Sequence, residues 1–287
     1  MVQISGNTFI ITGGVGGIGS GIAVDLLERG AKVVIFDILP QAVGAEKVKD
    51  LSKDNAIYVQ VDITDSTSTK AGVEKAVETF GNLKGVVHCA GITIRRDWSN
   101  DVADSIADFQ KMINVNTVGT FIVNAHVADA INKPLNHAPE RATKPFWTTD
   151  EERGVIINFS SAAAHGLYAR TLTYGPTKAA VAGITRALSD FLGPSGIRVN
   201  SVSPSIVASA MSQSNPGIFD YFLKDLETHA AFPRKPATPK DISHTIAYLI
   251  ENQFVNGEDI RVDGGWRLVT PNVPGEKDFR ELAPGLE

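Results

Sequence analysis

A serine, a tyrosine and a lysine in one stretch of the chain have the spacing of a proton-transfer site. Ser161 lies thirteen residues before Tyr174, and Lys178 follows the tyrosine by four residues. Residues four apart in a helix share a face, so we expect the ammonium near the phenol. A cation favours the phenolate. Lowering the tyrosine pKa by roughly 3 units takes about 4 kcal/mol, which we expect the lysine, a second positive charge such as an oxidised nicotinamide, and burial to supply together.

The surrounding sequence decides between a site and a coincidence. A Tyr-x-x-x-Lys pair also occurs in helices as an aromatic ring packed under a lysine stem. Here the apolar run at 154–159 predicts a buried strand that ends at Ser160 and Ser161. A helix is expected from Tyr174 to about Leu192. The carboxyl end of such a strand is where a parallel sheet carries its active site.

The beginning of the chain has the sequence of a nucleotide-binding unit. A β-branched and aromatic run at 8–12 predicts a buried strand, GGVGGIG follows at once, and a helix is expected from about 18 to 28. In this context backbone N–H groups and a helix N-terminus bind pyrophosphate, although a glycine loop alone is most often only a turn. The residues of the loop expected to contact a dinucleotide are Gly13, Gly17, Ile18 and Gly19.

Asp37 ends the next predicted strand, at 32–37, eighteen residues after Gly19. An acid at this point accepts both hydroxyls of an adenosine ribose and repels a 2′-phosphate. Because positions 14–16 and 38 hold no lysine or arginine, we expect NAD rather than NADP as the cofactor. The alternative is that Asp37 is an ordinary residue of the turn after the strand.

Strands and helices continue to alternate along the chain. Strands are expected at 56–61 and 85–88, and helices at 41–51 and 66–80. Such alternation forms parallel β-α-β units with right-handed crossovers. The sequence therefore predicts an α/β fold, a single-domain Rossmann-like doubly wound parallel sheet with helices on both faces. Further residues expected near the cofactor, after two of these strands, are Asp62, Ile63, Ala90 and Gly91.

The second half of the chain keeps this pattern with one irregularity. Strands are expected at 197–202 and 260–265, and helical patterning covers 109–131. Within that helix lie Asn114 and Asn116, whose amides compete for backbone partners. They predict either a local kink or a polar role.

One domain is expected over residues 1–269, followed by an extended tail over 270–287. Residues 132–153 hold three prolines and predict a surface loop, which is either a tolerated insertion or an oligomer contact or rim of the substrate mouth. Residues 208–236 are irregular but apolar and predict a mobile helical lid over the substrate. The alternative for these apolar residues is a core or subunit contact.

The composition excludes several classes of protein. The chain has 287 residues, and its net charge of −5, without a basic cluster, argues against nucleic acid as a partner. The single cysteine, Cys89, excludes an intramolecular disulfide and a cysteine-rich metal site. No apolar run reaches the ~18 residues of a membrane span, and no targeting pattern is seen at the N-terminus. We therefore expect a cytoplasmic protein with no membrane partner and no metal.

Taken together, these motifs resemble the shorter, single-domain branch of the short-chain dehydrogenase/reductase family. The resemblance covers residues 5–266, nearly the whole chain, and its motifs occur in the family's order. The matching motifs are TGGVGGIG at 12–19, Asp37, Asp62, CAG at 89–91, NTVG at 116–119, Ser161, YGPTK at 174–178, SPSIVAS at 203–209 and VDGGW at 262–266.

The resemblance implies a catalytic tetrad of Asn116, Ser161, Tyr174 and Lys178, and cofactor roles for further residues. Tyr174 would be the general acid/base, and Ser161 would donate a hydrogen bond to the substrate oxygen. Lys178 would hold the nicotinamide ribose and lower the tyrosine pKa, and Asn116 would anchor a water in the proton relay. Val207 would bind the nicotinamide carboxamide through its backbone. The other residues that the resemblance puts beside the cofactor are Pro204 and Ser209.

Three features depart from the family's pattern, the first of them a pair of residues. His88 and Cys89 stand where an asparagine pair is usual, so a changed contact between strand and cofactor is expected. Ser205 follows Pro204 in place of a glycine, which would stiffen the lid hinge. Pro176 lies in the first turn of a helix, where proline is tolerated. None of these changes removes a catalytic atom.

The sequence thus predicts an NAD-dependent alcohol dehydrogenase or ketone reductase for an apolar secondary alcohol or ketone. The insertion also resembles type-2 3-hydroxyacyl-CoA and hydroxysteroid dehydrogenases, and Arg95, Arg96 and Arg170 are candidates to meet a CoA. A protein that binds NAD without turnover is the alternative from another class, and the intact tetrad argues against it. A sugar epimerase would need a sugar-binding domain that the chain lacks. From the family we expect a homo-oligomer, dimer or tetramer.

Overall fold

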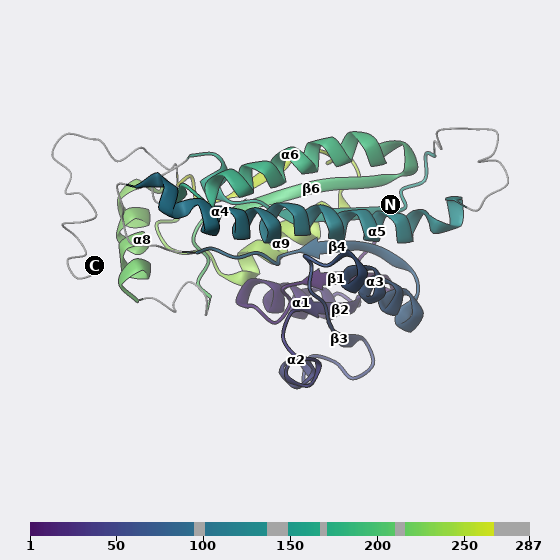
Figure 1. Ribbon diagram of the computed structural model, residues 1–287. Helices are drawn as coiled ribbons and strands as arrows, with labels where there is room; N and C mark the ends of the chain where they lie inside the picture. Colours follow the sequence, from purple (N-terminus) through teal and green to yellow (C-terminus); the bar gives the residue numbers. More distant parts are fainter. Residues whose placement is uncertain (95–100, 137–148, 167–170, 210–215, 267–287) are drawn as a thin grey trace.

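A seven-stranded parallel sheet forms the centre of the computed structural model (Figure 1). Its strands are β1 (Thr8–Thr12), β2 (Lys32–Asp37), β3 (Ala56–Gln60), β4 (Leu83–His88), β5 (Gly154–Phe159), β6 (Ile197–Pro204) and β7 (Asp259–Val262). They follow the order β3-β2-β1-β4-β5-β6-β7, so the direction of winding reverses between β1 and β4. The structure describes residues 1–94, 101–136, 149–166, 171–209 and 216–266.

Helices cover both faces of this sheet. The helices are α1 (Gly17–Glu28), α2 (Gln41–Val48), α3 (Ser66–Phe80), α4 (Ile106–Met112), α5 (Gly119–Asn136), α6 (Gly175–Leu192), α8 (Pro216–His229) and α9 (Pro239–Glu251), with 3-10 turns η1 (Val102–Ser105), η4 (Ala162–Ala164) and η6 (Gly193–Ser195) and a π-helical segment η2 (Ile113–Val118). One face packs against α1, α2 and α9, and the other against α3, α5 and α6. The predicted doubly wound α/β fold is confirmed. In Figure 1, α8 lies at the opposite end of the molecule from the N-terminus.

The central strands are unbroken apolar runs because both of their faces are buried. Phe9, Ile10 and Ile11 of β1 are all fully buried. Phe9 and Ile11 point to the core under α1 and α9, and Ile10 points to the core under α3 and α5. A strand with only one covered face would alternate apolar and polar residues.

Two predicted boundaries shift where packing overrides local sequence. Helix α2 ends at Val48 rather than Leu51, and Leu51 packs against the core from the turn that follows. Strand β4 begins at Leu83 rather than Gly85, because Leu83 pairs with Thr8 before a register shift.

The prediction of a surface loop over 132–153 is wrong at both ends. Helix α5 continues through Pro134 to Asn136, since Ile131 and the residues before it remain packed in the core. At the other end, Glu152 has a side chain only 8% exposed and forms an ion pair with Arg198. The middle of the insertion, 137–148, lies outside the described residues, as does the predicted tail at 270–287.

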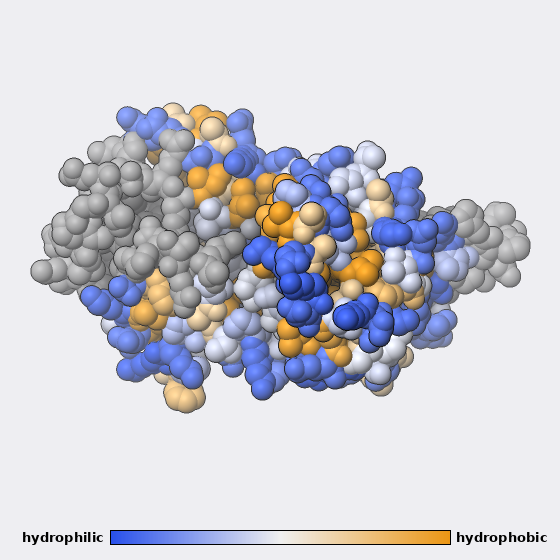
Figure 2. Space-filling view, turned by 90° about the horizontal axis from the view of Figure 1, so that it is seen from below, coloured by the Kyte–Doolittle hydropathy of each residue, from blue (hydrophilic) through white to orange (hydrophobic). Residues whose placement is uncertain are grey.

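The surface is mixed in character. Figure 2 shows hydrophilic residues interspersed with small hydrophobic patches on the face seen from below. Among the helices that the structure describes, none has the combination of length and hydropathy that a membrane span requires.

Candidate active site

Strand β5 and the first turn of α6 bring Ser161, Tyr174 and Lys178 together at the carboxyl edge of the sheet. Tyr174 is the N-cap residue of α6, and Lys178 lies in the first turn. The Lys178 ammonium lies 5.8 Å from the centre of the Tyr174 ring, and the Ser161 hydroxyl is near enough to the phenol to lower its pKa. Pro176 is the second residue of the helix, where no backbone donor is needed. The spacing in the sequence therefore corresponds to contact in space.

Lys178 is a buried cation. Only 5% of the residue is exposed, and its Nζ donates to the carbonyl oxygen of Phe159 at 2.8 Å. The hydroxyl of Ser160 donates to the carbonyl of Lys178 at 2.9 Å, which fixes the start of α6 against the end of β5. Burial lowers the pKa of Lys178 to about 8, so the ammonium form still predominates at neutral pH.

The pKa of Tyr174 differs from the prediction. Burial raises it above the usual value of 10.0, and the Ser161 hydroxyl opposes this shift without reversing it. The expectation that burial would help to lower the phenol pKa is wrong, because removal from water penalises the charged phenolate. In the polypeptide alone, the phenol therefore keeps its proton at neutral pH.

Asn116 lies in the π-helical segment between α4 and α5, where the sequence predicted a kink or a polar role. The residue is fully buried. Its Oδ1 accepts from the amide of Ile92 at 2.8 Å, and its Nδ2 donates to Ile92 O at 2.9 Å and to Thr177 Oγ1 at 3.1 Å. The carbonyl of Asn116 accepts from Thr120 Oγ1 at 2.6 Å. The side chain thus joins the segment after β4 to the first turn of α6.

The glycine loop between β1 and α1 is shaped by close backbone contacts. Gly13 has φ +63°, and a Cβ there would come 3.0 Å from the backbone of Ala90. A Cβ at Gly19 would collide with the carbonyl oxygen of Gly13. Helix α1 begins at Gly17, and its N-cap, Gly16, provides no side-chain cap. The first N–H groups of α1 are therefore left for an anion to accept.

Asp37, the last residue of β2, lies beside this loop. One carboxylate oxygen accepts from the amide of Val15 at 3.4 Å, and the other accepts from the amide of Ile38 at 2.9 Å. The hydroxyl of Tyr58 donates to the carbonyls of Asp37 and Leu39, at 3.0 and 2.5 Å. The turn that carries the carboxylate is therefore fastened to β3.

The side chains of Asp62, Ile63 and Ile18, all predicted to lie near the cofactor, are engaged in contacts within the protein. One oxygen of Asp62 accepts from both the amide and the hydroxyl of Thr64, at 2.9 and 2.7 Å. Ile63 is 8% exposed and packs in the core, and Ile18 packs against the opposite core. A cofactor would meet these two residues through their backbone.

The end of β4 holds the predicted Ala90 and Gly91 in a network that the sequence did not suggest. The amide of Ala90 donates to Thr12 Oγ1 at 3.1 Å, and the Thr12 hydroxyl lies 2.8 Å from His88 Nδ1. Burial, together with the charge of Lys178, lowers the pKa of His88 to about 3, so this imidazole is neutral. His88 thus supports the backbone turn in the place where the family has an asparagine.

Comparison with known proteins decides the family. A family model described as Enoyl-(Acyl carrier protein) reductase matches residues 13–267. A solved short-chain type dehydrogenase/reductase from Mycobacterium ulcerans superposes with a TM-score of 0.79 at 26% identity, covering 98% of this chain and 95% of that one. The chain belongs to the short-chain dehydrogenase/reductase family. It is an oxidoreductase of that family.

Two curated relatives of this short-chain dehydrogenase/reductase carry names of different activities. The 3-hydroxyacyl-CoA dehydrogenase type-2 of Drosophila melanogaster is 33% identical over 263 residues, which is 91% of this chain and 97% of that protein. Ipsdienol dehydrogenase of Ips pini is 29% identical over 277 residues, which is 93% of this chain and 99% of that protein.

Dehydrogenases of this family use nicotinamide dinucleotides, and the residues at the carboxyl edge fit such a group. A Cβ at Gly91 would come 3.2 Å from both Asn116 Oδ1 and Lys178 Nζ, so a larger residue there would crowd the ammonium. Strands β1 and β4 flank the point where the strand order reverses. Open α/β sheets bind their ligands at this position.

The segment after β6 carries the remaining predicted cofactor residues of this short-chain dehydrogenase/reductase. Pro204 is buried at the end of β6. Val207 is 5% exposed and forms a parallel bridge with Ala237. Ser209 is the last residue described before a gap in the chain. The bridge fixes the backbone of Val207 near the site.

The predicted lid contains helix α8, which is attached to the loop after β7. Trp266 is 3% exposed and donates from Nε1 to Asp225 at 2.6 Å. Its ring meets that of Phe222 edge-on, with centroids 6.2 Å apart. Leu226 and Ala162, the neighbour of Ser161, belong to the same apolar cluster. An apolar wall therefore begins one residue from the serine. Residues 210–215 lie outside the described part of the chain.

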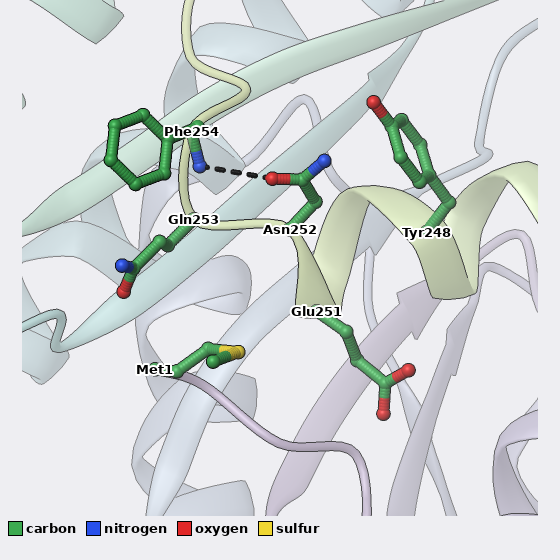
Figure 3. Close-up of a pocket in the computed structure, with 6 residues that line it drawn as sticks. All are labelled: Met1, Tyr248, Glu251, Asn252, Gln253 and Phe254. Atoms are coloured by element: carbon green, nitrogen blue, oxygen red, sulfur yellow. Dashed lines mark hydrogen bonds between the residues drawn. The ribbon is translucent and has the colours of Figure 1, made fainter.

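A pocket of about 400 Å³ lies at the opposite edge of the sheet, beyond the end of α9 (Figure 3). Its walls hold no member of the tetrad, and Glu251 provides their single carboxylate. Figure 3 shows the Phe254 amide bonded to the side chain of Asn252, with the Phe254 ring pointing outward. The predicted site residues lie at the carboxyl edge, and none of them lines this pocket. Its lining residues are Met1, Tyr248, Glu251, Asn252, Gln253 and Phe254.

Sequence reasoning missed the hydroxyl residues that hold the site in place. Thr12, Ser160 and Thr177 bond to residues far along the chain or to backbone carbonyls. Ser160 is adjacent to Ser161, which is a usable signal. For Thr12 and Thr177 no periodicity or spacing marks the role, since their contacts depend on the folded sheet.

Proposed function

We propose that this short-chain dehydrogenase/reductase transfers a hydride between NAD(H) and a secondary alcohol or its ketone, with Tyr174 as the general acid/base. The observation that carries the proposal is the Lys178 ammonium beside the Tyr174 ring. That ammonium is buried, and within the described residues it forms no ion pair with a carboxylate. An uncompensated cation next to a half-buried phenol stabilises the phenolate whenever the proton leaves.

Each member of the tetrad has a separate task in this proposal. The Tyr174 phenolate takes the hydroxyl proton of an alcohol, and the phenol returns it to a ketone oxygen. Ser161, whose hydroxyl is directed at the phenol in the polypeptide alone, would turn its single O–H donor to the same substrate oxygen. A bound nicotinamide supplies the hydride acceptor or donor, with a positive charge in its oxidised form. A positioned acid/base contributes ~10²–10⁴-fold.

Lys178 and Asn116 would assist the transfer of the proton rather than that of the hydride. Lys178 would hold the nicotinamide ribose and stabilise the phenolate. Asn116 would anchor the water that carries the proton onward. Its Nδ2 donates to Ile92 and Thr177, and its Oδ1 accepts from the amide of Ile92, so the second lone pair of Oδ1 would accept from that water.

NAD is proposed as the cofactor on the basis of Asp37. Its carboxylate lies within hydrogen-bond distance of the glycine-loop amide of Val15 and would accept the ribose hydroxyls. The pyrophosphate would lie on the start of α1, and Val207 would meet the carboxamide. The other residues proposed to contact the cofactor are Gly13, Gly17, Ile18, Gly19, Asp62, Ile63, Ala90, Gly91, Tyr174, Lys178, Pro204 and Ser209.

A 3-hydroxyacyl-CoA or hydroxysteroid substrate is the second candidate. The type-2 relative favours the acyl-CoA by its name, and the apolar cluster beside Ser161 accommodates either an acyl chain or a steroid. The arginines suggested for the CoA, Arg95, Arg96 and Arg170, lie outside the described residues. A homodimer or homotetramer and a cytoplasmic location stay predictions.

The test is a turnover assay that follows absorbance of the reduced nicotinamide. NAD and NADP are compared over secondary alcohols, hydroxysteroids and 3-hydroxyacyl-CoA esters. Tyr174→Phe is expected to lower kcat by ~10²–10⁴-fold. Tyr248→Phe is the matched control, because Tyr248 is 49% exposed on α9, away from the site. A preference for NADP would refute the role of Asp37, and NAD binding without turnover over the whole panel would favour a non-catalytic protein.

A further inference from the structure

A buried carboxylate outside the tetrad gathers three hydrogen-bond donors. Asp259 opens β7, and Ser201 and Ser203 of β6 donate to it from their hydroxyls at 2.8 Å each. Nε2 of His165 lies 2.8 Å from Asp259 Oδ2 and 3.1 Å from Ser203 Oγ. The side chain of Asp259 is 5% exposed and that of His165 is 32% exposed. The cluster is therefore closed on the carboxylate side and reaches the surface at the imidazole.

The bonding pattern fixes where the protons lie. An ionised carboxylate only accepts, so both serine hydroxyls must direct their hydrogens at Asp259. Nε2 of His165 faces the same carboxylate, and it must therefore carry a hydrogen and donate. His165 is thus the single imidazole donor of the cluster, and Ser203 receives part of the same N–H.

His165 is four residues after Ser161, at the end of one tight turn. Ser161 is the N-cap of η4, and its Oγ accepts from the amide of Ala163 at 3.2 Å. The amide of Ala164 donates to Ser161 O at 2.9 Å, and that of His165 donates to Ala162 O at 3.1 Å. Because the amides of Ala163, Ala164 and His165 are all bonded within the turn, Ser161 and His165 move as one unit.

This turn is held at both ends. At its start, the hydroxyl of Ser160 is bonded to the carbonyl of Lys178. At its end, His165 is bonded to β6 and β7 through Ser203 and Asp259. Asp259 has no lysine or arginine within ion-pair distance in the described part of the chain, so its burial is compensated by these donors alone. Loss of the imidazole donor would leave that compensation incomplete.

We propose that His165, anchored by its hydrogen bond to Asp259, is a positioning residue for Ser161. The pair fixes the turn that starts at the serine and so sets the place of the serine hydroxyl against Tyr174. This inference rests on the proposed function, in which Ser161 donates to the substrate oxygen. Neither His165 nor Asp259 touches the reacting atoms.

The test compares His165→Ala with His165→Gln. Glutamine carries an N–H donor close to the place of imidazole Nε2, whereas alanine carries none. His165→Ala is expected to lower kcat by about tenfold to 100-fold, the scale of a misplaced reacting group, with KM for NAD unchanged. His165→Gln is expected to restore most of the loss. His244→Ala, at an exposed histidine of α9, is the matched control and should leave kcat unchanged.

A second measurement is independent of turnover. Hydrogen–deuterium exchange of the amides at 163–165 should become faster in His165→Ala and stay near the wild-type rate in His165→Gln. Wild-type kcat in the alanine variant, or an equal loss in both variants, would overturn the inference. Unchanged exchange in the alanine variant would overturn it as well. Absence of turnover in the wild-type protein would count against the proposed function. The exchange experiment would still show whether His165 fixes the turn that begins at Ser161.

Discussion

Two buried cations, Lys178 and Arg198, lie at opposite edges of the same sheet and are treated in opposite ways. Their exposed fractions are 5% and 6%. Arg198 donates to Glu152 at 2.6 Å and to the carbonyls of Leu249 and Ile250 at 2.7 Å each. Lys178 donates to one carbonyl, and in the described residues no carboxylate forms an ion pair with it.

The difference separates a structural charge from a reactive one. Arg198 caps the last turn of α9, and Glu152, which also accepts from the amide of Val2 at 2.7 Å, neutralises it. The charge of Lys178 has no anion to compensate it in the described part of the chain, so its burial costs free energy. The lowering of its pKa to about 8 reflects that cost. Such a cost is typical of functional sites.

The largest expected effect comes from removing the reactive cation. Lys178→Met should lower kcat by ~10²–10⁴-fold, because the Tyr174 phenolate loses the charge that stabilises it. The free energy of unfolding should not fall, since a buried, unpaired charge is replaced by an apolar side chain. Steady-state kinetics and urea unfolding measure the two quantities. A large loss of stability with unchanged kcat per folded molecule would contradict the comparison.

Removing the partner of the structural cation should have the converse result. Glu152→Gln leaves Arg198 buried without its anion, which is expected to lower the free energy of unfolding by about 3–5 kcal/mol. Below the unfolding transition, kcat should stay close to wild type. Glu151→Gln is the matched control, because Glu151 is exposed and its side chain forms no ion pair in the described residues. A kcat that falls with the stability would show that the two edges are coupled.

The strands of this fold were predictable because burial on both faces leaves unbroken apolar runs. Strands β1, β2 and β5 have the predicted bounds of Thr8–Thr12, Lys32–Asp37 and Gly154–Phe159. The continuation of α5 through Pro134 was not predictable. The sequence shows a helix breaker there, and the packing that outweighs it involves residues from other strands.

For the site, the residues of the tetrad were predictable from the sequence. The hydrogen bonds that hold them in place and the direction of their pKa shifts were not. Tyr174 and Lys178 are four residues apart, so helical geometry alone joins them. Thr12 and His88 are 76 residues apart, and their contact exists only because β1 pairs with β4. The direction of the Tyr174 pKa shift depends on burial, a property of the folded chain that no spacing encodes.

The smallest of these effects is a pH dependence that follows from the Lys178 pKa. This pKa is 10.5 for a lysine side chain in water and about 8 in the folded protein. Between these values the unfolded chain binds more protons than the folded one, so stability should rise with pH through this window. Below pH 8 the buried ammonium should lower the free energy of unfolding by roughly 3 kcal/mol, at about 1.36 kcal/mol per unit.

Lys178→Met supplies the reference for this measurement, because every other titrating group is shared. Urea unfolding of both proteins at pH 7 and pH 10.5 gives a difference between wild type and variant at each pH. The wild-type deficit should be largest at pH 7 and shrink as the ammonium loses its proton. A difference that does not vary with pH would mean that Lys178 titrates alike in both states. Lys178 would then not differ from Arg198, whose charge is neutralised by Glu152, in the energetic cost of its burial.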